Sequence, residues 1–309
     1  MKTSTTIGPI ARMVGEERAI ALVAEAGFDA FDFSASPAYR YDWATGREMT
    51  DNPHPLASRE YLSFVRRLGA VAKEYGIRCN QSHAPFPTDA PNIRDRVLRA
   101  LECTAMLGGE ICVVHPMNNA SAEANREMYE SLLPYAKEYG VKIALENMYN
   151  WNENGACPAA CSSPADFLRH LSLLPKEHFC ACLDIGHAEM KGVNTSAVEM
   201  ICALGDNLKA LHIHDVDGVN DNHALPFTLA VDFPSVVNAL REINYEGYFT
   251  LEVLGEHTNR FTTVTIGEGV KELYRSARRL ADMFEGKKQA RVLTFANACF
   301  LKREIHKQF

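Results

Sequence analysis

The chain has 309 residues, of which 47% are hydrophobic and 23% charged, which is the composition of a globular protein with one large domain or two small ones. A formal net charge of -7 excludes a global basic field that would attract nucleic acid. No segment is apolar and long enough to predict a membrane span.

The nine cysteines are odd in number and scattered along the chain. Cys112, Cys180, Cys182 and Cys202 lie inside apolar runs, which favours buried, reduced thiols over a disulfide framework. The first ten residues also lack the long apolar core of a signal peptide. We therefore expect a cytoplasmic protein.

Short apolar runs alternate with segments of helical period along most of the chain. Strands are expected at residues 3–7, 30–34, 77–83, 111–115, 141–146, 179–184, 208–214 and 248–253. Helices are expected at residues 16–26, 58–75, 93–107, 122–139, from 164 onward, and at 196–203, 234–243 and 267–284. Eight such pairs predict an α/β protein, a (β/α)8 TIM barrel, over residues 1–284, with an open doubly wound sheet as the alternative.

Residues 285–309 lie beyond the eighth unit and form a predicted C-terminal extension. The segment is basic around an apolar stretch that runs from Val292 to Leu301. Because its charges flank apolar residues and do not form one block, we expect an added helix or strand that packs on the barrel or on a partner subunit. A homo-oligomer is therefore a possible assembly.

Imidazoles and carboxylates stand at or just past the ends of successive apolar runs. These candidate metal ligands are His83, His115, Glu146, Asp184, His187, His212, Asp221, His223 and Glu252. If the strands are parallel and close into a barrel, their ends meet at one mouth, where barrel enzymes keep their chemistry. Histidine with carboxylate is a ligand set for zinc, manganese and related ions, so we expect one to three divalent ions there.

Glu146 and Glu252 each interrupt an apolar run, directly after Leu145 and Leu251. A carboxylate in such a place is costly unless it is paired or bound to a metal. For one glutamate alone, a buried salt bridge to Lys or Arg is an equal alternative. The two together, with the other candidate ligands, favour metal binding.

Two further motifs place more than one candidate side by side. Asp184-Ile-Gly-His187 sets a carboxylate at a strand end and an imidazole three residues later, with Gly186 expected to permit a tight turn. The alternative is that Asp184 caps the next helix. His212 and His214 alternate on one strand, so they share a face, and either one is expected to ligate metal while the other contacts substrate or orients a ligand.

The whole set of motifs resembles the xylose isomerase-like TIM-barrel superfamily, which holds sugar and sugar-phosphate isomerases and epimerases and the endonuclease IV group. The resemblance covers roughly residues 3–284. It is carried by Ser82-His-Ala-Pro-Phe86, Val114-His-Pro116, Leu145-Glu-Asn147, Cys182-Leu-Asp-Ile-Gly-His187, His212-Ile-His-Asp215, Asp221-Asn-His223 and Leu251-Glu252.

The resemblance implies which residues hold metal. The superfamily's single-ion site corresponds to Glu146, Asp184, His212 or His214, and Glu252. The endonuclease IV group adds ligands that match His83, His115, His187, Asp221 and His223, and these imply a three-zinc cluster.

The resemblance also implies the reaction: a metal-dependent sugar or sugar-phosphate isomerase or epimerase, in which Glu146 and Glu252 pass a proton through an enediolate. An endonuclease IV-like zinc phosphodiesterase and a non-catalytic sugar-binding barrel are the alternatives. The chain departs from the DNA-repair members in its acidic net charge. Its loop at residues 35–56 is acidic and aromatic where a phosphate-tracking loop is basic, so nucleic acid is not the expected partner.

Aromatic residues follow two of the predicted strands, with Tyr39, Tyr41 and Trp43 after the second and Tyr149 and Trp151 after the fifth. We expect some of these rings to line the pocket and stack on a sugar. Tyr39, Trp151 and His214 are the predicted substrate contacts. The alternative is that the loops fold on themselves and bury their rings.

The number of candidates predicts at least two divalent ions, preferably zinc. Crowded carboxylates would repel one another without cations. We expect Glu146 to bridge two ions, His83 and His115 to serve one, Asp184 and Glu252 another, and Asp221 with His223 a third. Each ligating histidine should donate its second ring nitrogen to a carboxylate or carbonyl.

Overall fold

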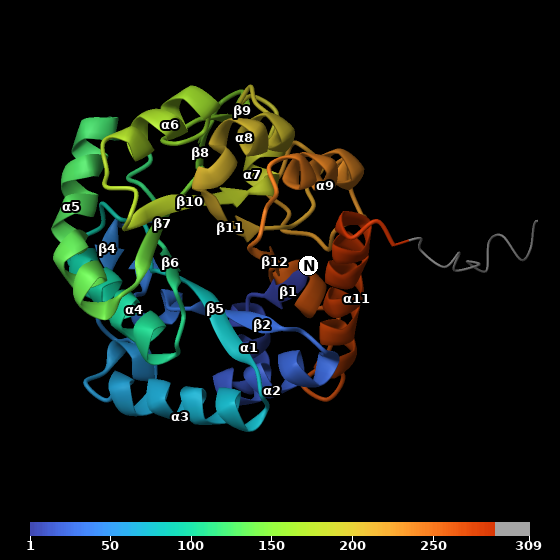
Figure 1. Cartoon of the computed structure of the whole chain (residues 1–309). Helices are drawn as coiled ribbons and strands as arrows, with labels where there is room; N and C mark the ends of the chain where they lie inside the picture. Colours follow the sequence, from blue (N-terminus) through green and yellow to red (C-terminus); the bar gives the residue numbers. More distant parts are fainter. Residues whose placement is uncertain (288–309) are drawn as a thin grey trace, which may run out of the picture.

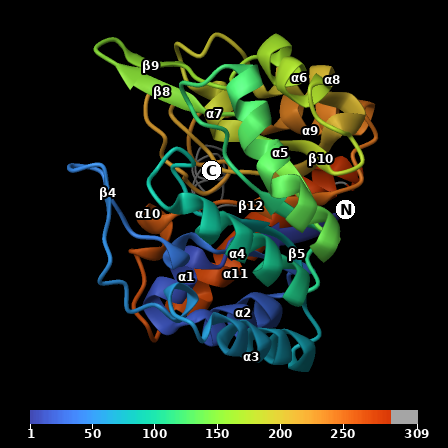
Figure 2. The same ribbon diagram turned by 90° about the vertical axis from the view of Figure 1, so that its left-hand side faces the viewer.

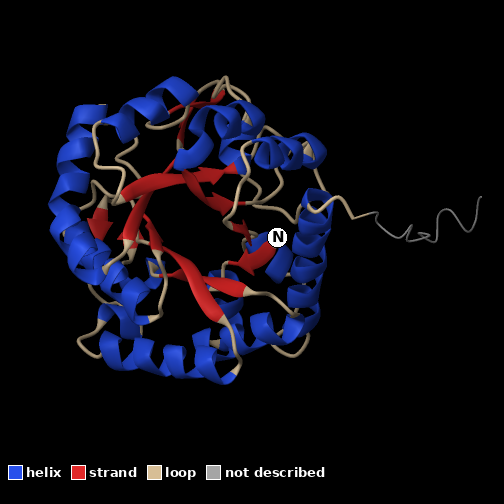
Figure 3. Ribbon diagram, in the orientation of Figure 1, coloured by secondary structure: helices blue, strands red, loops and turns tan. Residues whose placement is uncertain are grey.

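The structure is a computed structural model that describes residues 1–287. Strands form an inner wall and helices an outer ring (Figures 1 and 3). The eight wall strands are β1 (Lys2–Thr5), β2 (Ala30–Ser34), β5 (Arg78–His83), β6 (Ile111–Val113), β7 (Lys142–Glu146), β10 (Phe179–Asp184), β11 (Leu208–His212) and β12 (Tyr248–Leu251).

The eight strands close into a barrel. Six pair in parallel in the order β11-β10-β7-β6-β5-β2, and β1 pairs in parallel with β12. Parallel bridges between Thr6 and Asp32 and between Ile213 and Leu251 join the two sheets at both seams. The predicted TIM barrel is confirmed, and the open doubly wound alternative is wrong.

Within residues 1–287, eight α-helices match predicted segments, whereas the three shortest α-helices, at residues 8–14, 185–189 and 255–258, were not predicted. The helices are α1 (Gly8–Val14), α2 (Glu16–Ala26), α3 (Tyr61–Glu74), α4 (Ile93–Met106), α5 (Ala122–Tyr139), α6 (Pro164–Ser172), α7 (Ile185–Glu189), α8 (Ala197–Leu204), α9 (Phe233–Glu242), α10 (Gly255–Thr258) and α11 (Ile266–Phe284). The Ser163 side chain caps α6 by accepting a hydrogen bond from the Asp166 amide, as Ser163-Pro164 predicts. None of these helices, within residues 1–287, is both long and apolar enough to cross a membrane.

Alternation along the strands decides which side chains enter the barrel. Alternate residues of a strand face opposite sides. A small apolar cluster, separate from the main core, is built from Val113, Ala144, Cys180, Cys182 and Ala210 and fills part of the interior. Glu146, Asp184 and His212 each follow one of these inward residues by two positions, so the same alternation turns them into the barrel.

Several short elements depart from the expected pattern. Two antiparallel hairpins, β3 (Tyr41–Asp42) with β4 (Arg47–Glu48) and β8 (Tyr149–Asn152) with β9 (Gly155–Pro158), interrupt loops expected to be irregular. Both project from the same end of the barrel (Figure 2). Four strands, β1, β6, β11 and β12, each end two residues before the predicted end. The predicted helix or strand of the C-terminal extension lies almost wholly outside the described residues.

One cysteine prediction is wrong. Cys202 is exposed, because it lies on the outer face of α8 while its neighbours Met200 and Ile201 are buried. The other named thiols are buried, and all eight cysteines within residues 1–287 are free.

Candidate metal centre and cavity

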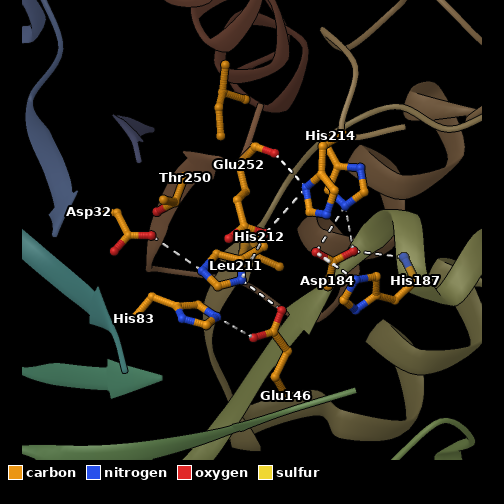
Figure 4. A network of polar contacts seen from close by, with 12 residues as sticks. Asp32, His83, Glu146, Asp184, His187, Leu211, His212, His214, Thr250 and Glu252 are labelled. Atoms are coloured by element: carbon orange, nitrogen blue, oxygen red, sulfur yellow. Dashed lines mark hydrogen bonds and ion pairs between the residues drawn. The ribbon is translucent and has the colours of Figure 1, made fainter. Parts of the chain in front are cut away.

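The carboxyl ends of the strands bring the predicted ligands to one mouth of the barrel. Figure 4 shows imidazoles and carboxylates from β5, β7, β10, β11 and β12 facing one another. Most of these side chains are buried, so each one needs a partner for its polar atoms. They divide into two groups around a central imidazole.

The first group comes from three neighbouring strands. His83 ends β5, His115 lies just past β6, and Glu146 ends β7. Glu146 Oε2 lies 3.0 Å from His115 Nε2 and 3.4 Å from His83 Nε2, and the two Nε2 atoms are 2.8 Å apart. Two imidazole nitrogens and a carboxylate oxygen that face one point are a donor set suited to zinc.

The second group lies across the mouth, around Asp184 and Asp221. His214 Nε2 is 2.9 Å from Asp184 Oδ1, and His223 Nε2 is 3.1 Å from Asp221 Oδ2. His187 Nε2 lies 3.6 Å from Asp221 Oδ2 and 3.9 Å from Asp184 Oδ2. The rings of His214 and His223 stack with their centroids 3.8 Å apart.

His212 occupies the middle of the site. Its Nδ1 lies 2.8 Å from Glu146 Oε1 and 3.6 Å from Glu252 Oε2, and its Nε2 lies 3.4 Å from Asp32 Oδ2. One imidazole therefore stands between the two glutamates predicted to act as acid and base. Of the two histidines left open on this strand, His212 is the one beside both of these glutamates.

Within residues 1–287, six sets of donor atoms are compact enough to hold a cation, and three of them describe most of the site. Within each set the donor atoms lie within 4.8 Å of one another: His83, His115 and Glu146; His187, His214, Asp221 and His223; and Asp184, His214, His223 and Glu252. The first and second sets share no residue. His212 belongs to a further set with His83 and Glu252, so the structure brings together all nine candidate ligands, while metal binding and the number of ions stay predictions.

Hydrogen bonds to backbone carbonyls orient three of the imidazoles. The Nδ1 atoms of His83, His187 and His223 lie 2.8 Å, 2.9 Å and 2.9 Å from the carbonyl oxygens of Ala84, Asn147 and Glu252, respectively. If Nδ1 carries the proton it donates to the carbonyl, and the lone pair of Nε2 is then directed into the cluster. This is the arrangement expected of metal-ligating histidines.

The unsatisfied polar atoms of the protein gather at the same place. Within residues 1–287, eight buried side-chain nitrogen or oxygen atoms have no hydrogen-bond partner. Six of the eight belong to Asp32, Glu146, His212, His214 and Asp221. A buried polar atom without a partner is costly, and cation coordination would satisfy atoms of this kind. The residues present therefore fit a divalent metal ion.

Charge pairing across the second group shifts the pKa of its members. Burial lowers the pKa of His223, but the Asp221 hydrogen bond together with the charges of Glu252, Asp221 and Asp184 outweighs burial and raises the pKa to about 9. Burial likewise opposes the charge on His187, yet Asp184 and Asp221 hold its pKa well above the usual value. When no cation is bound, the protonated imidazoles of His187 and His223 therefore balance the negative charge of Asp184 and Asp221.

In the first group a single carboxylate, Glu146, faces several imidazoles. Burial raises the pKa of Glu146, but the neighbouring His212 and His115 overcome it and hold the pKa well below the usual range. Burial lowers the pKa of His115, and the Glu146 charge only partly offsets this effect. Glu146 is thus held ionised, the form needed both for a metal ligand and for a base.

A cavity of about 520 Å³ opens over the cluster. Its wall includes His83, His115, Glu146, His187, Asp221, His223 and Glu252. A volume of this size suits a small molecule such as a sugar. A cavity of about 660 Å³ lies elsewhere, near Gly140 and Gly247, but no imidazole of residues 1–287 lines it, so the mouth is the candidate site.

The three predicted substrate contacts lie in different environments. Trp151 lines the cavity from the β8–β9 hairpin and is 52% exposed. Tyr39 is buried away from the cavity wall, and its hydroxyl donates a hydrogen bond of 2.7 Å to the Pro91 carbonyl. His214 is fully buried beneath His223 and does not line the cavity. The structure therefore brings Trp151 alone of the three to the wall, and contact of Tyr39 or His214 with substrate stays a prediction.

Gly186 is needed for a reason other than the predicted turn. Its φ is not positive, so the chain there does not require glycine for its backbone conformation. A Cβ atom at this position would lie 2.0 Å from Cε1 of His214. Gly186 therefore permits the close approach of His214 to Asp184. The alternative role of Asp184 also holds, because Oδ1 accepts the His187 amide hydrogen bond at the start of α7.

Three residues of the site had no predicted role. Asp32 lies in the middle of β2 and is fully buried against His212. Asn147 links β7 to β10, since its side chain exchanges hydrogen bonds of 2.9 Å and 2.8 Å with the Asp184 backbone. Phe86 lines the cavity, with its ring 4.6 Å from that of His115. The polar residue between Phe31 and Phe33 was a usable signal for Asp32.

We expect Asp32→Asn to weaken zinc binding by roughly 10- to 100-fold, the effect usual for a residue that orients a metal ligand. The Asp32 carboxylate lies next to Nε2 of His212 and so orients the ring with Nδ1 toward Glu146. Zinc titration of the purified variant measures the change. Asp29→Asn is the matched control, because Asp29 accepts its hydrogen bonds from Thr3, away from the cluster. Unaltered zinc affinity in Asp32→Asn would remove this role.

Comparisons with known proteins agree with the fold. The sequence profile of the xylose isomerase-like TIM barrel family matches residues 20–283. Fructoselysine 3-epimerase of Escherichia coli O157:H7 is 28% identical over 133 residues, which are 43% of this chain and 46% of that protein. The aligned segments are 62% and 46% of the length of two curated relatives, so the chain spans roughly half of the proteins it matches.

Solved structures share the architecture over nearly the whole chain. A D-tagatose 3-epimerase-like protein superposes with a TM-score of 0.63 at 20% identity, covering 91% of this chain and 100% of that one. The IOLI protein, solved with a bound zinc atom, superposes with a TM-score of 0.68 at 15% identity, covering 92% and 99%. At these identities the likeness shows the fold, while the profile match covers well over half of the sequence. The chain belongs to the xylose isomerase-like TIM barrel family.

Proposed function

We propose that the protein is a metal-dependent isomerase or epimerase of a sugar or sugar phosphate. The observation that carries the proposal is the pair of glutamates on the cavity wall. Glu146 and Glu252 approach the same nitrogen of His212 from different strands, at 2.8 Å and 3.6 Å. Two carboxylates beside one point are suited to removing a proton from carbon and returning it.

Glu146, Asp184, His212 and Glu252 would hold the ion that this reaction uses, with the other imidazoles available for a second. A bound divalent ion supplies Lewis acidity, which acidifies the proton next to a carbonyl group. The depressed pKa of Glu146 keeps it ionised and ready to accept that proton. Glu252 would deliver a proton to the opposite face of the same carbon, through an enediolate, and so invert the centre.

Two further features support the proposal. One relative and one structural neighbour named above carry the names of sugar epimerases, and the IOLI protein was solved with a bound zinc atom. Phe86, Tyr149 and Trp151 line the cavity and offer ring faces to the apolar side of a sugar. The free cysteines suit a reducing compartment, so we infer a cytoplasmic location.

Deuterium exchange tests the reaction. Ketoses are incubated with the zinc- or manganese-loaded protein in deuterated water, and NMR follows the proton at the reacting carbon. We expect solvent deuterium at that carbon in the product. Isomerisation without deuterium would indicate a hydride shift. A sugar that raises the melting temperature but shows neither exchange nor product would indicate a binding protein without turnover.

A zinc phosphodiesterase is the second candidate, and the compact group of His187, His214, Asp221 and His223 favours it. His187, Asp221 and His223 of this group lie outside the four residues that would hold the ion of a single-ion isomerase. Against it, Arg12 is the only lysine or arginine among residues 1–287 that lines the cavity, whereas a DNA backbone calls for several. Zinc-dependent cleavage at an abasic site, lost in Glu146→Gln, would decide for this candidate, and no cleavage at nanomolar protein would exclude it.

Trp151→Ala should raise the Michaelis constant for the accepted sugar by roughly 2- to 10-fold, the contribution expected of one aromatic contact. Metal content should change little, because Trp151 is not among the candidate ligands. Steady-state kinetics with metal analysis measure both. Trp43→Ala is the matched control, since Trp43 lies on the other hairpin and is 68% exposed outside the cavity wall. An unchanged constant with lower thermal stability would make Trp151 structural.

A further inference from the structure

A second chamber adjoins the cavity above the metal centre. It has a volume of about 470 Å³ and lies between α1 and the loop at residues 35–56. The two spaces share Gly8, Arg12 and Ser34 on their walls. A molecule at the metal centre that is longer than its reacting carbons can therefore extend toward this junction.

Arg12 supplies a positive charge at the junction. It lies on α1, is exposed, and among residues 1–287 forms neither an ion pair nor a side-chain hydrogen bond. Glu16 lines the same chamber, but its carboxylate lies 2.8 Å from His54 Nε2. The nearest wall carboxylate is thus engaged by a histidine, and the guanidinium retains its full capacity to bind an anion.

Charge is distributed unevenly along the walls. The carboxylates on the cavity wall, Glu146, Asp221 and Glu252, all belong to candidate metal groups. In the part of the chain that the structure describes, Arg12 is the only lysine or arginine on that wall, and Arg40 joins it in the chamber. Arg40 is held only weakly, with Nη1 3.9 Å from Asp51 Oδ1 in an exposed pair. The wall carboxylates are thus engaged within the metal groups, and an anionic group would be attracted to the positive charge of Arg12 and Arg40 at the junction.

The junction also offers polar groups at close range. The hydroxyl-bearing residues Ser34 and Ser36 line the cavity beside Arg12. A Cβ atom at Gly8 would lie 3.2 Å from Ser34 Cβ and 3.5 Å from Ser34 Oγ. Gly8 therefore leaves open a space beside the serine that any side chain would narrow. A guanidinium with neighbouring hydroxyls is a suitable set of donors for a phosphate or carboxylate.

We infer that the junction binds an anionic group of the substrate, a phosphate monoester or a carboxylate, at the end remote from the reacting carbon. The inference rests on the proposed function, because it assigns that remote group to the sugar turned over at the metal centre. It narrows the substrate class to acidic sugars or sugar esters. Neutral ketoses would occupy the cavity without using Arg12.

Kinetics with matched substrates test the inference. A neutral ketohexose, its terminal phosphate ester and a ketose with a terminal carboxylate are compared on the metal-loaded wild type and on Arg12→Gln. We expect Arg12→Gln to raise the Michaelis constant of the preferred anionic sugar by roughly 10- to 100-fold, as for a lost charge-assisted hydrogen bond, and to leave the neutral sugar unchanged. Arg12→Lys should restore part of the loss. Arg18→Gln is the control, because Arg18 pairs with Glu25 on α2.

The ranking of the two anionic substrates distinguishes a phosphate from a carboxylate site. Equal use of the neutral and anionic sugars, or an equal effect of Arg12→Gln on all of them, would overturn the inference. Calorimetric titration with inorganic phosphate separates this failure from failure of the proposed function, because it needs no turnover. The wild type and Arg12→Gln are compared at equal zinc content. Weaker phosphate binding by Arg12→Gln supports the site even without turnover. Equal binding by the two proteins, or no binding by either, overturns it.

Discussion

Glu146→Gln is expected to lower kcat by roughly 10³- to 10⁴-fold, the upper range of a general acid–base contribution. Glutamine keeps the size of the side chain but cannot accept the proton. It also removes the negative charge that lies 3.0 Å from His115 Nε2 and 2.8 Å from His212 Nδ1. We therefore expect the variant to bind less zinc as well. Stopped assays with metal analysis and a thermal melt measure the three quantities.

Glu110→Gln is the matched control for this loss, since Glu110 is exposed and lines the cavity that lacks imidazoles. Glu252→Gln separates the role of base from the role of ligand. With two bases, each epimer loses its proton to a different carboxylate, so Glu252→Gln should retain deuterium exchange from one epimer and lose it from the other. Equal residual exchange from both epimers would contradict the two-base mechanism, and a fully active Glu146→Gln would exclude Glu146 as a base.

The barrel itself was predictable because its signals are local. Strands β2 and β10 and helices α2 and α5 have the predicted boundaries, since each is a strongly periodic segment with a clear end, such as the Gly140 that follows α5 in a left-handed conformation. The two hairpins were missed because strands as short as β3 and β4 bury too little to leave an apolar pattern.

The site was predictable where the strand ends alone define it. Parallel strands carry their carboxyl ends to one mouth, so the side chains that gather there could be predicted from the sequence, while their role as ligands stays a prediction. The roles of residues that act through one hydrogen-bond partner, distant in sequence, could not be predicted. Asn147 stands within the predicted motif, yet its role comes from the Asp184 backbone, which is distant in sequence. Nothing local reveals that Tyr39 donates its hydroxyl hydrogen to Pro91 and turns away from the cavity.

Zinc binding at pH 7 should release protons, and the apparent affinity should rise with pH up to about 9. An imidazolium cannot ligate a metal, so any histidine that is protonated in the metal-free protein must first lose its proton. The pKa of His223 is raised to about 9, and the pKa values of His187 and His212 lie well above the usual value. At pH 7, protonation of His223 alone should weaken zinc binding by roughly 100-fold.

Calorimetry in buffers of different ionisation enthalpy counts the protons released. We expect more than one proton when the cluster is filled, and His223→Gln should reduce the number by one. A release of no protons at pH 7, with an affinity that does not change between pH 7 and pH 9, would show that the cluster is not the zinc site.

The same shifts predict opposite pH dependences of stability for the metal-free and zinc-loaded forms. His223 has a folded-state pKa of about 9, above its unfolded value, so its stabilising charge is fully present below about pH 6.5 and is lost as the pH rises through 9. Asp184, with a pKa lowered to about 2, stays ionised throughout this window and does not offset the loss. The melting temperature of the metal-free protein should therefore fall between pH 6.5 and 9. The melting temperature of the zinc-loaded protein should rise over the same range, because zinc affinity rises with pH. Parallel curves for the two forms would contradict competition between protons and zinc at the cluster.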